Sequence, residues 1–391
     1  MSLSIVLLAA GEGKRMKTNL PKPLVMLGSD PLVQHSLNTI KIMKPEKTIL
    51  VTGFKKDEVK KYVLSNNSGD FIFCEQKERL GTGHAVQQAA PYIPVNGKTI
   101  VLYSDVPLVS AKTLKKLIRS SLRKKISILT TNLKNPKGYG RVIRTEKQDI
   151  EAIREEADAN SKEKQIQEIF SGIMVVDNAF LKKGLKTLVR NNAAGEYYLT
   201  DIVKILSNEN KNITFIEIDE EEILGINTQL DLSIAEGISQ NLIRNKAMMN
   251  GVKLIDPNST FINYDTKFGK DVIIQPNVVF GNNVVIDSFV EIKSFSHIEE
   301  CRIKKGSIIG PFARIRGGTT IGEKSKVGNF VEIKKSDISK KVKISHLSYI
   351  GDSEIGSLTN IGAGTITCNY DGKNKNKTKI GKNTFVGSNS T

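Results

Sequence analysis

The sequence predicts two different folds in one chain of 391 residues: an α/β domain with a doubly wound, mainly parallel sheet, followed by a left-handed parallel β-helix. In the first half, apolar strand-like runs alternate with amphipathic stretches, which is the rhythm of repeated β-α-β units. In the second half, aliphatic residues recur every six residues, and this period fits neither a helix nor a hairpin. The length also exceeds one ordinary hydrophobic core, so two domains are expected.

The α/β domain is predicted over residues 1–227. Its first strand is expected at residues 5–8, where four aliphatic residues in succession suit a central strand buried on both faces. Later strands are expected at residues 48–51, 71–73, 99–103 and 126–130. Ligands of such sheets bind beyond the carboxyl ends of the strands, so the loops that follow these runs are the places to search for chemistry.

A linker helix is predicted over residues 228–250, because Leu230, Ile234, Ile238 and Leu242 recur every four residues with polar residues between them. Packing of this stripe against the protein is the expected reason for the spacing. A functional stripe is the alternative.

The β-helix is predicted over residues 251–391. Each six-residue unit should form one flat side of a triangular coil with its aliphatic residue inside. The inward positions are Val272, Val278, Val284, Val290, Ile309, Ile315, Ile321, Val327, Ile333, Ile338, Ile344, Ile350, Ile355 and Ile361. Such a prism is a scaffold, so a purely structural or oligomerising role is also open.

Composition argues against several classes of protein. The net charge is +17, but the lysines are spread along the whole chain and Trp is absent, which does not favour nucleic-acid binding. There is no apolar span of 18 residues and no signal-peptide pattern, so no membrane association and a cytoplasmic location are expected. Cys74, Cys301 and Cys368 are widely separated, which supports neither a disulfide framework nor a zinc site.

The strand at residues 5–8 leads into a loop that contains Gly11, Gly13, Arg15 and, a few residues on, Lys22. Glycines let backbone N–H groups close on an anion at a helix entrance, and the two cations add charge. The loop is not a Walker A motif, because no Gly-Lys-Ser/Thr follows, and Met16 occupies the third glycine position of the Rossmann pattern. The loop therefore predicts another kind of phosphate chemistry.

Two further strand ends carry polar residues. The loop from Gln76 to His84, with Gly81 and Thr82, suits backbone approach to a base or ribose, although a turn without a ligand is the alternative. Asp105 ends the strand at residues 99–103 and is the best metal ligand in the chain, because Mg²⁺ needs only one or two protein oxygens beside water and phosphate. A role as a helix N-cap is its alternative.

The string Leu8-Ala9-Ala10-Gly11-Glu12-Gly13-Lys14-Arg15-Met16 with Pro21-Lys22 resembles the signature of the sugar-1-phosphate nucleotidyltransferases. Those enzymes couple a nucleoside triphosphate to a sugar phosphate and release pyrophosphate. The resemblance implies that UTP contacts Leu8, Ala9, Ala10, Gly11, Tyr103 and Ser104, that Gln76, Gly81 and Thr82 read uracil, and that Arg15 and Lys22 are catalytic. It also implies Mg²⁺ at Asp105 and Asn227.

The strings at residues 138–141 and 195–201 resemble the sugar-side loops of one subfamily, the bifunctional enzymes that join an N-acetylglucosamine-1-phosphate uridylyltransferase to a glucosamine-1-phosphate N-acetyltransferase. This resemblance implies that Gly140 and Glu155 bind the sugar. The chain departs from the pattern at Ala157, where the subfamily has lysine, and at Phe170, where it has an asparagine that would bond the sugar. The loss of an amide at a sugar site predicts altered sugar identity or affinity.

The second half resembles the acetyltransferase half of the same enzymes, through the strings at residues 310–316, 329–335, 346–349, 360–365 and 368–372. His346 is the base candidate, because its unperturbed pKa lies near neutrality. The resemblance implies a homotrimer with acetyl-CoA and the amino sugar bound between neighbours by Arg316, Lys334, Tyr349, Asn360, Ala363, Asn369, Tyr370 and Ser388. Relatives continue beyond Thr391, so a truncated chain that binds acetyl-CoA poorly is expected.

Taken together, these features predict a bifunctional enzyme of cell-envelope amino-sugar biosynthesis that makes UDP-N-acetylglucosamine. Two alternatives stay open. One is a monofunctional nucleotidyltransferase whose β-helix only trimerises it, against which His346, Arg316 and Lys334 argue. The other is a trimeric scaffold that merely binds nucleotide, against which Arg15, Lys22 and Asp105 argue.

Overall fold

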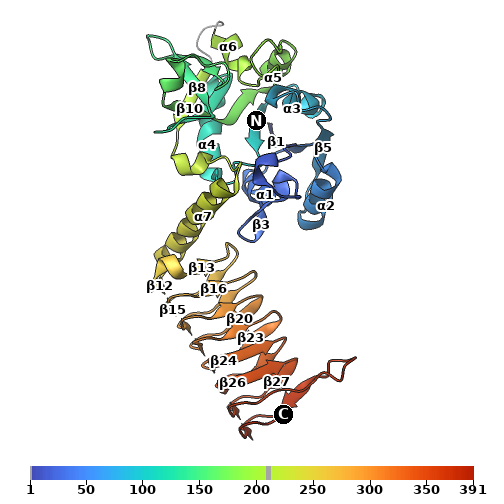
Figure 1. The fold of residues 1–391 in the computed structure, drawn as a ribbon, viewed down its shortest axis with the longest axis vertical. Helices are drawn as coiled ribbons and strands as arrows, with labels where there is room; N and C mark the ends of the chain where they lie inside the picture. Colours follow the sequence, from blue (N-terminus) through green and yellow to red (C-terminus); the bar gives the residue numbers. More distant parts are fainter. Residues whose placement is uncertain (1, 208–212) are drawn as a thin grey trace. The chain divides into compact units, whose positions relative to one another are not determined.

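The structure is a computed structural model that describes residues 2–207 and 213–391. It divides into two compact units, Met1–Glu236 and Gly237–Thr391 (Figure 1).

The first unit is built on a mixed, mainly parallel sheet with the order β11-β7-β10-β6-β1-β4-β5. β1 lies between β4 and β6, and Ile5, Val6 and Leu7 are fully buried in it, as four aliphatic residues in succession predict. β10 runs antiparallel to β6 and β7, and a hairpin of β8 and β9 extends it. The strands span Leu3–Ala9 (β1), Met26–Leu27 (β2), Asp30–Pro31 (β3), Lys47–Thr52 (β4), Phe71–Glu75 (β5), Lys98–Tyr103 (β6), Ile126–Asn132 (β7), Gly140–Arg144 (β8), Ile150–Arg154 (β9), Glu168–Asp177 (β10) and Ile213–Glu217 (β11), which confirms the predicted strands.

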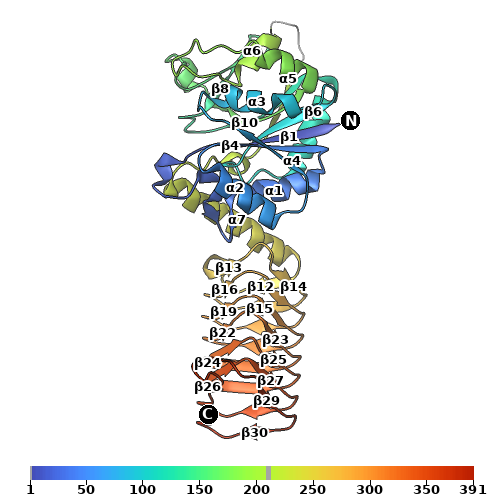
Figure 2. The same ribbon diagram turned by 90° about the vertical axis from the view of Figure 1, so that its right-hand side faces the viewer.

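Helices cover both faces of this sheet, so the doubly wound prediction is confirmed (Figure 2). On one face Leu37, Val59 and Leu114 pack from α1 (Leu32–Met43), α2 (Lys56–Asn66) and α4 (Ala111–Ser120). On the other face the helices are α3 (Thr82–Ala89), α5 (Asn178–Leu185) and α6 (Asp201–Ser207).

The predicted linker helix is present as α7 (Gln229–Met249), but the predicted packing of its aliphatic stripe is wrong. Leu230, Ile234 and Leu242 are exposed. The buried positions are instead Ala235, which packs in the first unit, Arg244, and Ala247, which packs in the core of the second unit.

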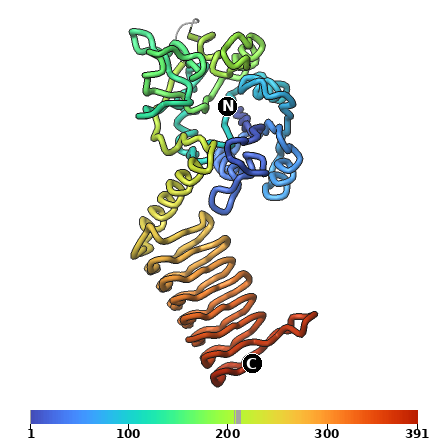
Figure 3. Tube along the Cα trace, viewed as in Figure 1, coloured from blue at the N-terminus to red at the C-terminus, as the bar shows by residue number. Residues whose placement is uncertain are grey.

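The second unit is a left-handed parallel β-helix whose coils stack along one axis (Figure 3). Each coil consists of three hexapeptides, so Val279 pairs with His297, which lies 18 residues later in the next coil. The coils are formed by β12 (Val252–Leu254), β13 (Phe261–Ile262), β14 (Lys267–Phe268), β15 (Val272–Ile274), β16 (Val279–Phe280), β17 (Val285–Ile286), β18 (Glu291–Ile292), β19 (His297–Ile298), β20 (Cys301–Ile303), β21 (Ile308–Ile309), β22 (Arg314–Ile315), β23 (Thr319–Ile321), β24 (Lys326–Lys334), β25 (Asp337–Ile338), β26 (Lys343–Gly351), β27 (Ser353–Ile355), β28 (Asn360–Ile361), β29 (Thr378–Ile380) and β30 (Phe385–Val386).

The aliphatic residues predicted to point inward are buried along the whole stack, from Val272 to Ile361. The hexapeptide prediction is therefore confirmed residue by residue. Cys74 and Cys301 are buried free thiols and Cys368 is an exposed one.

Candidate active sites

A cavity of about 290 Å³ lies at the carboxyl ends of β1 and β6, where the strand pattern predicts a ligand. It brings together ten of the predicted residues: Leu8, Ala10, Gly11, Lys22, Gln76, Gly81, Thr82, Tyr103, Ser104 and Asp105. Ala9 is buried at the end of β1. Arg79 and Glu196 also line the cavity, and the sequence alone did not single them out.

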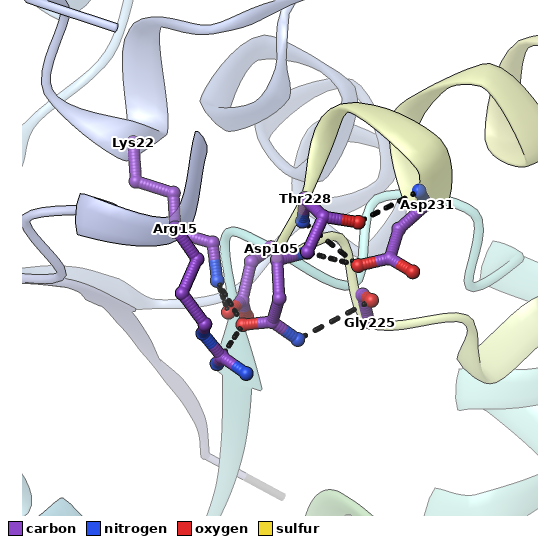
Figure 4. Close-up of polar contacts among 7 residues, drawn as sticks. Arg15, Lys22, Asp105, Gly225, Thr228 and Asp231 are labelled. Carbon is purple, nitrogen blue, oxygen red and sulfur yellow. Dashed lines mark hydrogen bonds and ion pairs between the residues drawn. The ribbon is translucent and has the colours of Figure 1, made fainter. Parts of the chain in front are cut away.

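Two cations converge on the predicted metal ligands at this cavity (Figure 4). The Lys22 ammonium donates to Asp105 Oδ2 and, at 2.9 Å, to Asn227 Oδ1. Arg15 donates to the same Asn227 oxygen at 2.8 Å. Lys22 is buried, so its ion pair with Asp105 is shielded from water better than a surface pair would be.

The start of α7 holds Asn227 in place. Asp231 Oδ2 accepts hydrogen bonds from the backbone N–H groups of Asn227 at 2.9 Å and Thr228 at 2.8 Å, and the N–H of Asp231 donates to Thr228 Oγ1 at 3.1 Å (Figure 4). Ile226 N–H donates to the Asp105 carbonyl at 2.8 Å. Sequence reasoning missed Asp231, although Thr228-Gln-Leu-Asp231 is a recognisable capping pattern.

The loop after β1 differs from the expected helix entrance. It forms a single 3₁₀ turn at Lys14–Met16, with left-handed backbone at Gly13 (φ 74°) and Lys17 (φ 49°) on either side. A Cβ at Gly13 would lie 2.9 Å from Lys22 Cβ, so this glycine is needed for the loop to close over Lys22.

The loop after β5 is closed on itself and tied to a distant segment. Gln76 Nε2 donates to the Gly81 carbonyl at 3.0 Å. Gly83 N–H donates to the Tyr197 carbonyl at 2.7 Å, and a Cβ at Gly81 would collide with that same carbonyl. These contacts hold Gln76, Gly81 and Thr82 at the cavity wall.

The predicted sugar residues lie on neighbouring strands. Glu155 Oε1 accepts from Thr200 Oγ1 at 2.9 Å, and burial raises the pKa of the Glu155 carboxyl. Its other oxygen faces Gly140, which pairs with Phe170 across β8 and β10. Phe170 is buried in an apolar cluster. A second cavity of about 400 Å³ adjoins Glu155, between β9, α6 and the segment before it.

The residues at the first cavity fit a magnesium ion. Asp105 and Asn227 offer one carboxylate and one amide oxygen that converge on a single atom, Lys22 Nζ, so both can reach one cation. Within residues 2–207 and 213–391, no group of three or more His, Cys, Asp or Glu forms an all-protein metal site. This donor set suits a metal that takes its other ligands from phosphate and water.

In the β-helix, His346 lies beside Asn329 of the preceding coil, where β24 and β26 are in register. His346 Nδ1 and Asn329 Oδ1 are 2.7 Å apart. A protonated Nδ1 donates to this amide oxygen, and Nε2 then carries the free lone pair that a general base needs.

Cationic side chains lie on the same coils. Arg316 donates to Glu332 at 2.8 Å. The neighbouring Lys375 side chain lowers the pKa of the Lys334 ammonium. Lys375 was not predicted; its segment pairs back onto Tyr370.

The remaining predicted residues of this half occupy the last coils. Tyr349 pairs with Ile366, Asn360 pairs with Phe385, and the Ala363 carbonyl accepts from Asn389 N–H at 2.8 Å, next to Ser388. Asn369 donates to Asp352 at 3.2 Å, and the Tyr370 hydroxyl donates to the Gly372 carbonyl at 2.7 Å.

Fold and sites together define a nucleotidyltransferase domain followed by a transferase of the hexapeptide type. The model of the MobA-like NTP transferase domain matches residues 5–168, and that of the bacterial transferase hexapeptide (six repeats) matches residues 300–335. Three relatives are each called bifunctional protein GlmU. The protein of Idiomarina loihiensis is 42% identical, and the match covers 100% of this chain and 89% of that protein. The protein of Zymomonas mobilis is 42% identical, with 99% of this chain and 87% of that protein covered. The protein of Buchnera aphidicola is 43% identical, with 98% of this chain and 87% of that protein covered.

The chain belongs to the GlmU family of bifunctional enzymes. It is a sugar-1-phosphate uridylyltransferase and N-acetyltransferase of UDP-N-acetylglucosamine synthesis. At the level of fold it also resembles a protein of Bacillus anthracis, a candidate glucose-1-phosphate thymidylyltransferase solved with sucrose, with a TM-score of 0.51, 18% identity, and coverage of 61% of this chain and 95% of that one. Among the described helices, none has the length and apolar character of a membrane span.

Proposed function

We propose that the cavity at the end of β1 is where the uridylyl group passes from UTP to N-acetylglucosamine-1-phosphate. The observation that carries the proposal is that Lys22, which lines the cavity, bonds both Asp105 and Asn227, and that Arg15 bonds the same Asn227 oxygen. Buried or loop-held cations next to a carboxylate and an amide oxygen suit a reaction in which negative charge spreads over phosphoryl oxygens.

In the proposed reaction, a phosphate oxygen of the sugar attacks the α-phosphorus of UTP in line. The bond from that phosphorus to the bridging oxygen breaks, and pyrophosphate leaves with the electron pair. Arg15 and Lys22 stabilise the charge that develops, and Gln76 and Gly81 hold the base. Glu155 accepts a hydrogen bond from a sugar hydroxyl.

We propose that Asp105 and Asn227 hold Mg²⁺ when nucleotide is bound. The ion supplies positive charge that neutralises the phosphates. Lys22, which bonds both oxygens in the structure, is then free to contact the nucleotide.

In the β-helix, we propose that His346 Nε2 takes the proton from the amine of glucosamine-1-phosphate as that amine attacks the thioester carbonyl of acetyl-CoA. The thiolate of coenzyme A leaves, and the acetyl group stays on nitrogen. Asn329 holds the imidazole tautomer, and Arg316, Lys334 and Lys375 hold the sugar phosphate.

We propose a homotrimer that assembles through the β-helix. Phe295, Phe312 and Phe330 stack at one corner of successive coils, with ring centroids 5.0 and 5.1 Å apart, and all three are exposed. A continuous exposed aromatic column is typical of a protein interface. It leads to Leu347, next to His346, so a neighbouring copy would cover the acetyl-transfer site. We also propose a cytoplasmic location, because the three cysteines are free thiols.

The test of the nucleotidyltransferase proposal is pyrophosphate release with UTP and a panel of sugar phosphates. N-acetylglucosamine-1-phosphate should be used, activity should stop when divalent cations are chelated, and Asp105→Asn should lose about 10²- to 10³-fold in rate, the usual scale for losing one charge-stabilising group. Full activity of Asp105→Asn, or full activity without divalent cations, would contradict the proposal.

A further inference from the structure

An ion pair joins the two loops that flank the nucleotide cavity. Glu12, between the two glycines of the loop after β1, accepts a hydrogen bond from Arg79, in the loop after β5. Lys14 Nζ lies 3.8 Å from the same carboxylate oxygen. Arg79 also lines the cavity, together with Lys22 and Gln76.

Local contacts hold each of the two loops in place beside the cavity. The loop after β1 is closed over Lys22 by Gly13, whose added Cβ would lie 2.9 Å from Lys22 Cβ. The loop after β5 is held by Tyr197, whose N–H donates to the Leu80 carbonyl at 2.8 Å. Exchange of Arg79 from Glu12 to a ligand would therefore need only rotation of its side chain.

The ion pair between Arg79 and Glu12 is weak enough for a ligand to replace one partner. The Arg79 side chain is 52% exposed and that of Glu12 is 23% exposed, and ion pairs so open to water are weak and easily replaced. Hydrogen bonding from Arg79 lowers the pKa of the Glu12 carboxyl, which stays ionised at neutral pH. A guanidinium fork binds phosphate oxygens as readily as it binds a carboxylate.

A second cation–carboxylate pair lies at this cavity, and it is better shielded from water than the first. Lys22 bonds Asp105, as Arg79 bonds Glu12, so each carboxylate occupies a cation that a polyphosphate could also bind. With Lys14 and Arg15 there are four cations at or beside the cavity, and with Glu196 there are three carboxylates. An incoming triphosphate competes with the carboxylates for these cations.

We infer that Arg79 is an additional binding residue for the triphosphate of UTP, and that Glu12 is a placeholder that holds Arg79 at the cavity and competes with the nucleotide for it. The inference rests on the proposed uridylyltransferase function. If the Glu12–Arg79 pair were a structural clasp, that is, a contact that holds the two loops in the binding conformation, removing the Glu12 charge would weaken nucleotide binding. The placeholder role predicts the opposite, that removing this charge favours nucleotide binding.

The test compares Arg79→Gln, Glu12→Gln and the double variant, measuring the KM for UTP, the KM for the sugar phosphate and kcat at low and high salt. Arg79→Gln should raise the KM for UTP about five- to tenfold at low salt, and the effect should shrink at high salt. Glu12→Gln should lower the KM for UTP about two- to fivefold. The double variant should resemble Arg79→Gln, and kcat and the sugar-phosphate KM should change little.

Arg302→Gln is the matched control, because Arg302 is 56% exposed and pairs with Asp287 at 3.1 Å on the β-helix. It removes the same charge and should leave the KM for UTP unchanged. A raised KM for UTP in Glu12→Gln would show that the pair is a clasp and would overturn the placeholder role, and an unchanged KM in Arg79→Gln would overturn phosphate binding. If these variants behave as the parent while Asp105→Asn is inactive, only this inference fails and the proposed function stands.

Discussion

The acid–base chemistry of Glu155 is set by its burial. Burial raises the pKa of its carboxyl above the ordinary value of 4.5, although Thr200 donates to it. An ionised Glu155 is the better acceptor for a sugar hydroxyl, so sugar-phosphate binding should strengthen as pH rises through this raised pKa. We predict that kcat/KM for the sugar phosphate falls on the acid side with an inflection that Glu155→Gln removes. The same inflection in the variant would contradict the role.

The raised pKa also has a consequence for stability. Folding favours the protonated form of Glu155. The contribution of this carboxyl to the free energy of unfolding is therefore fully present below its pKa in the unfolded chain and is lost as the pH rises to its higher pKa in the folded protein. Glu155→Gln should therefore unfold at a higher temperature than the parent at neutral pH and at the same temperature in acid. Thermal unfolding at two pH values measures this difference, which an activity assay alone would not show.

Phe170 marks a departure from the subfamily that the structure places beside Gly140. If one hydrogen bond to the sugar is missing, use of N-acetylglucosamine-1-phosphate should be weaker than in a relative with asparagine by about 1–3 kcal/mol. Phe170→Asn should lower the KM for this sugar phosphate. Because Phe170 is buried, the variant should also be less stable, which thermal unfolding measures separately.

The control for this change is Phe170→Leu, which keeps an apolar side chain and should leave the KM unchanged. An equal KM in Phe170→Asn and the parent would show that another residue makes the sugar contact.

At the scale of residues, the sequence predicted the side chains that line the cavity better than the hydrogen bonds and ion pairs that hold them. Lys22, Gln76 and Asp105 could be found because each follows a strand, and parallel strands end at one edge of a sheet. Arg79 and Asp231 could not be found in that way, because their roles depend on contacts with Glu12 and Asn227, which are far away in the sequence. Side-chain pairing between loops leaves no periodic signal.

Secondary-structure elements place the acetyl-transfer residues through strand register. β24 and β26 are in register over nine residues, which puts Asn329 directly beside His346. We predict that Asn329→Ala lowers acetyl transfer to glucosamine-1-phosphate about 10- to 100-fold, since the imidazole loses the acceptor that fixes its tautomer, and that His346→Ala loses about 10²- to 10⁴-fold.

The measurement is formation of the free thiol of coenzyme A. Uridylyl transfer by the same preparations is the internal control and should be unchanged. Parent rates of acetyl transfer in His346→Ala would exclude general-base catalysis by this residue.

At the scale of elements, a regular sequence pattern matches the buried face in the β-helix but not in α7. Every aliphatic residue that the six-residue period predicted to point inward is buried, since each inward position repeats one local rule. Further core residues, such as Ile298 and Ile303, were not predicted. The stripe of α7 obeys the same kind of rule but is exposed, because the helix packs through Ala235 and Ala247 instead. Spacing alone does not tell which side of a helix faces its neighbours.

At the scale of the whole molecule, the proposed homotrimer can be tested through the exposed aromatic column of the β-helix. We predict that the parent sediments as a trimer and that Phe312→Ser with Phe330→Ser shifts it toward monomer at micromolar concentration, because the exposed aromatic column is the proposed interface. Phe289→Ser is the control, since Phe289 is equally exposed but lies on another corner of the coil. A monomeric parent, or a trimer that survives the double change, would contradict this assignment.

The central claim is that this one chain transfers a uridylyl group at the cavity built around Lys22. The most direct measurement is the formation of UDP-N-acetylglucosamine and pyrophosphate from UTP and N-acetylglucosamine-1-phosphate by the parent and by Lys22→Ala, with thermal unfolding recorded for both. We predict that the parent forms both products in equal amounts and that Lys22→Ala, although folded, is slower by about 10²-fold or more, because the developing phosphoryl charge loses its buried cation. An undiminished rate in folded Lys22→Ala, or no product from the parent with Mg²⁺ present, would contradict the account.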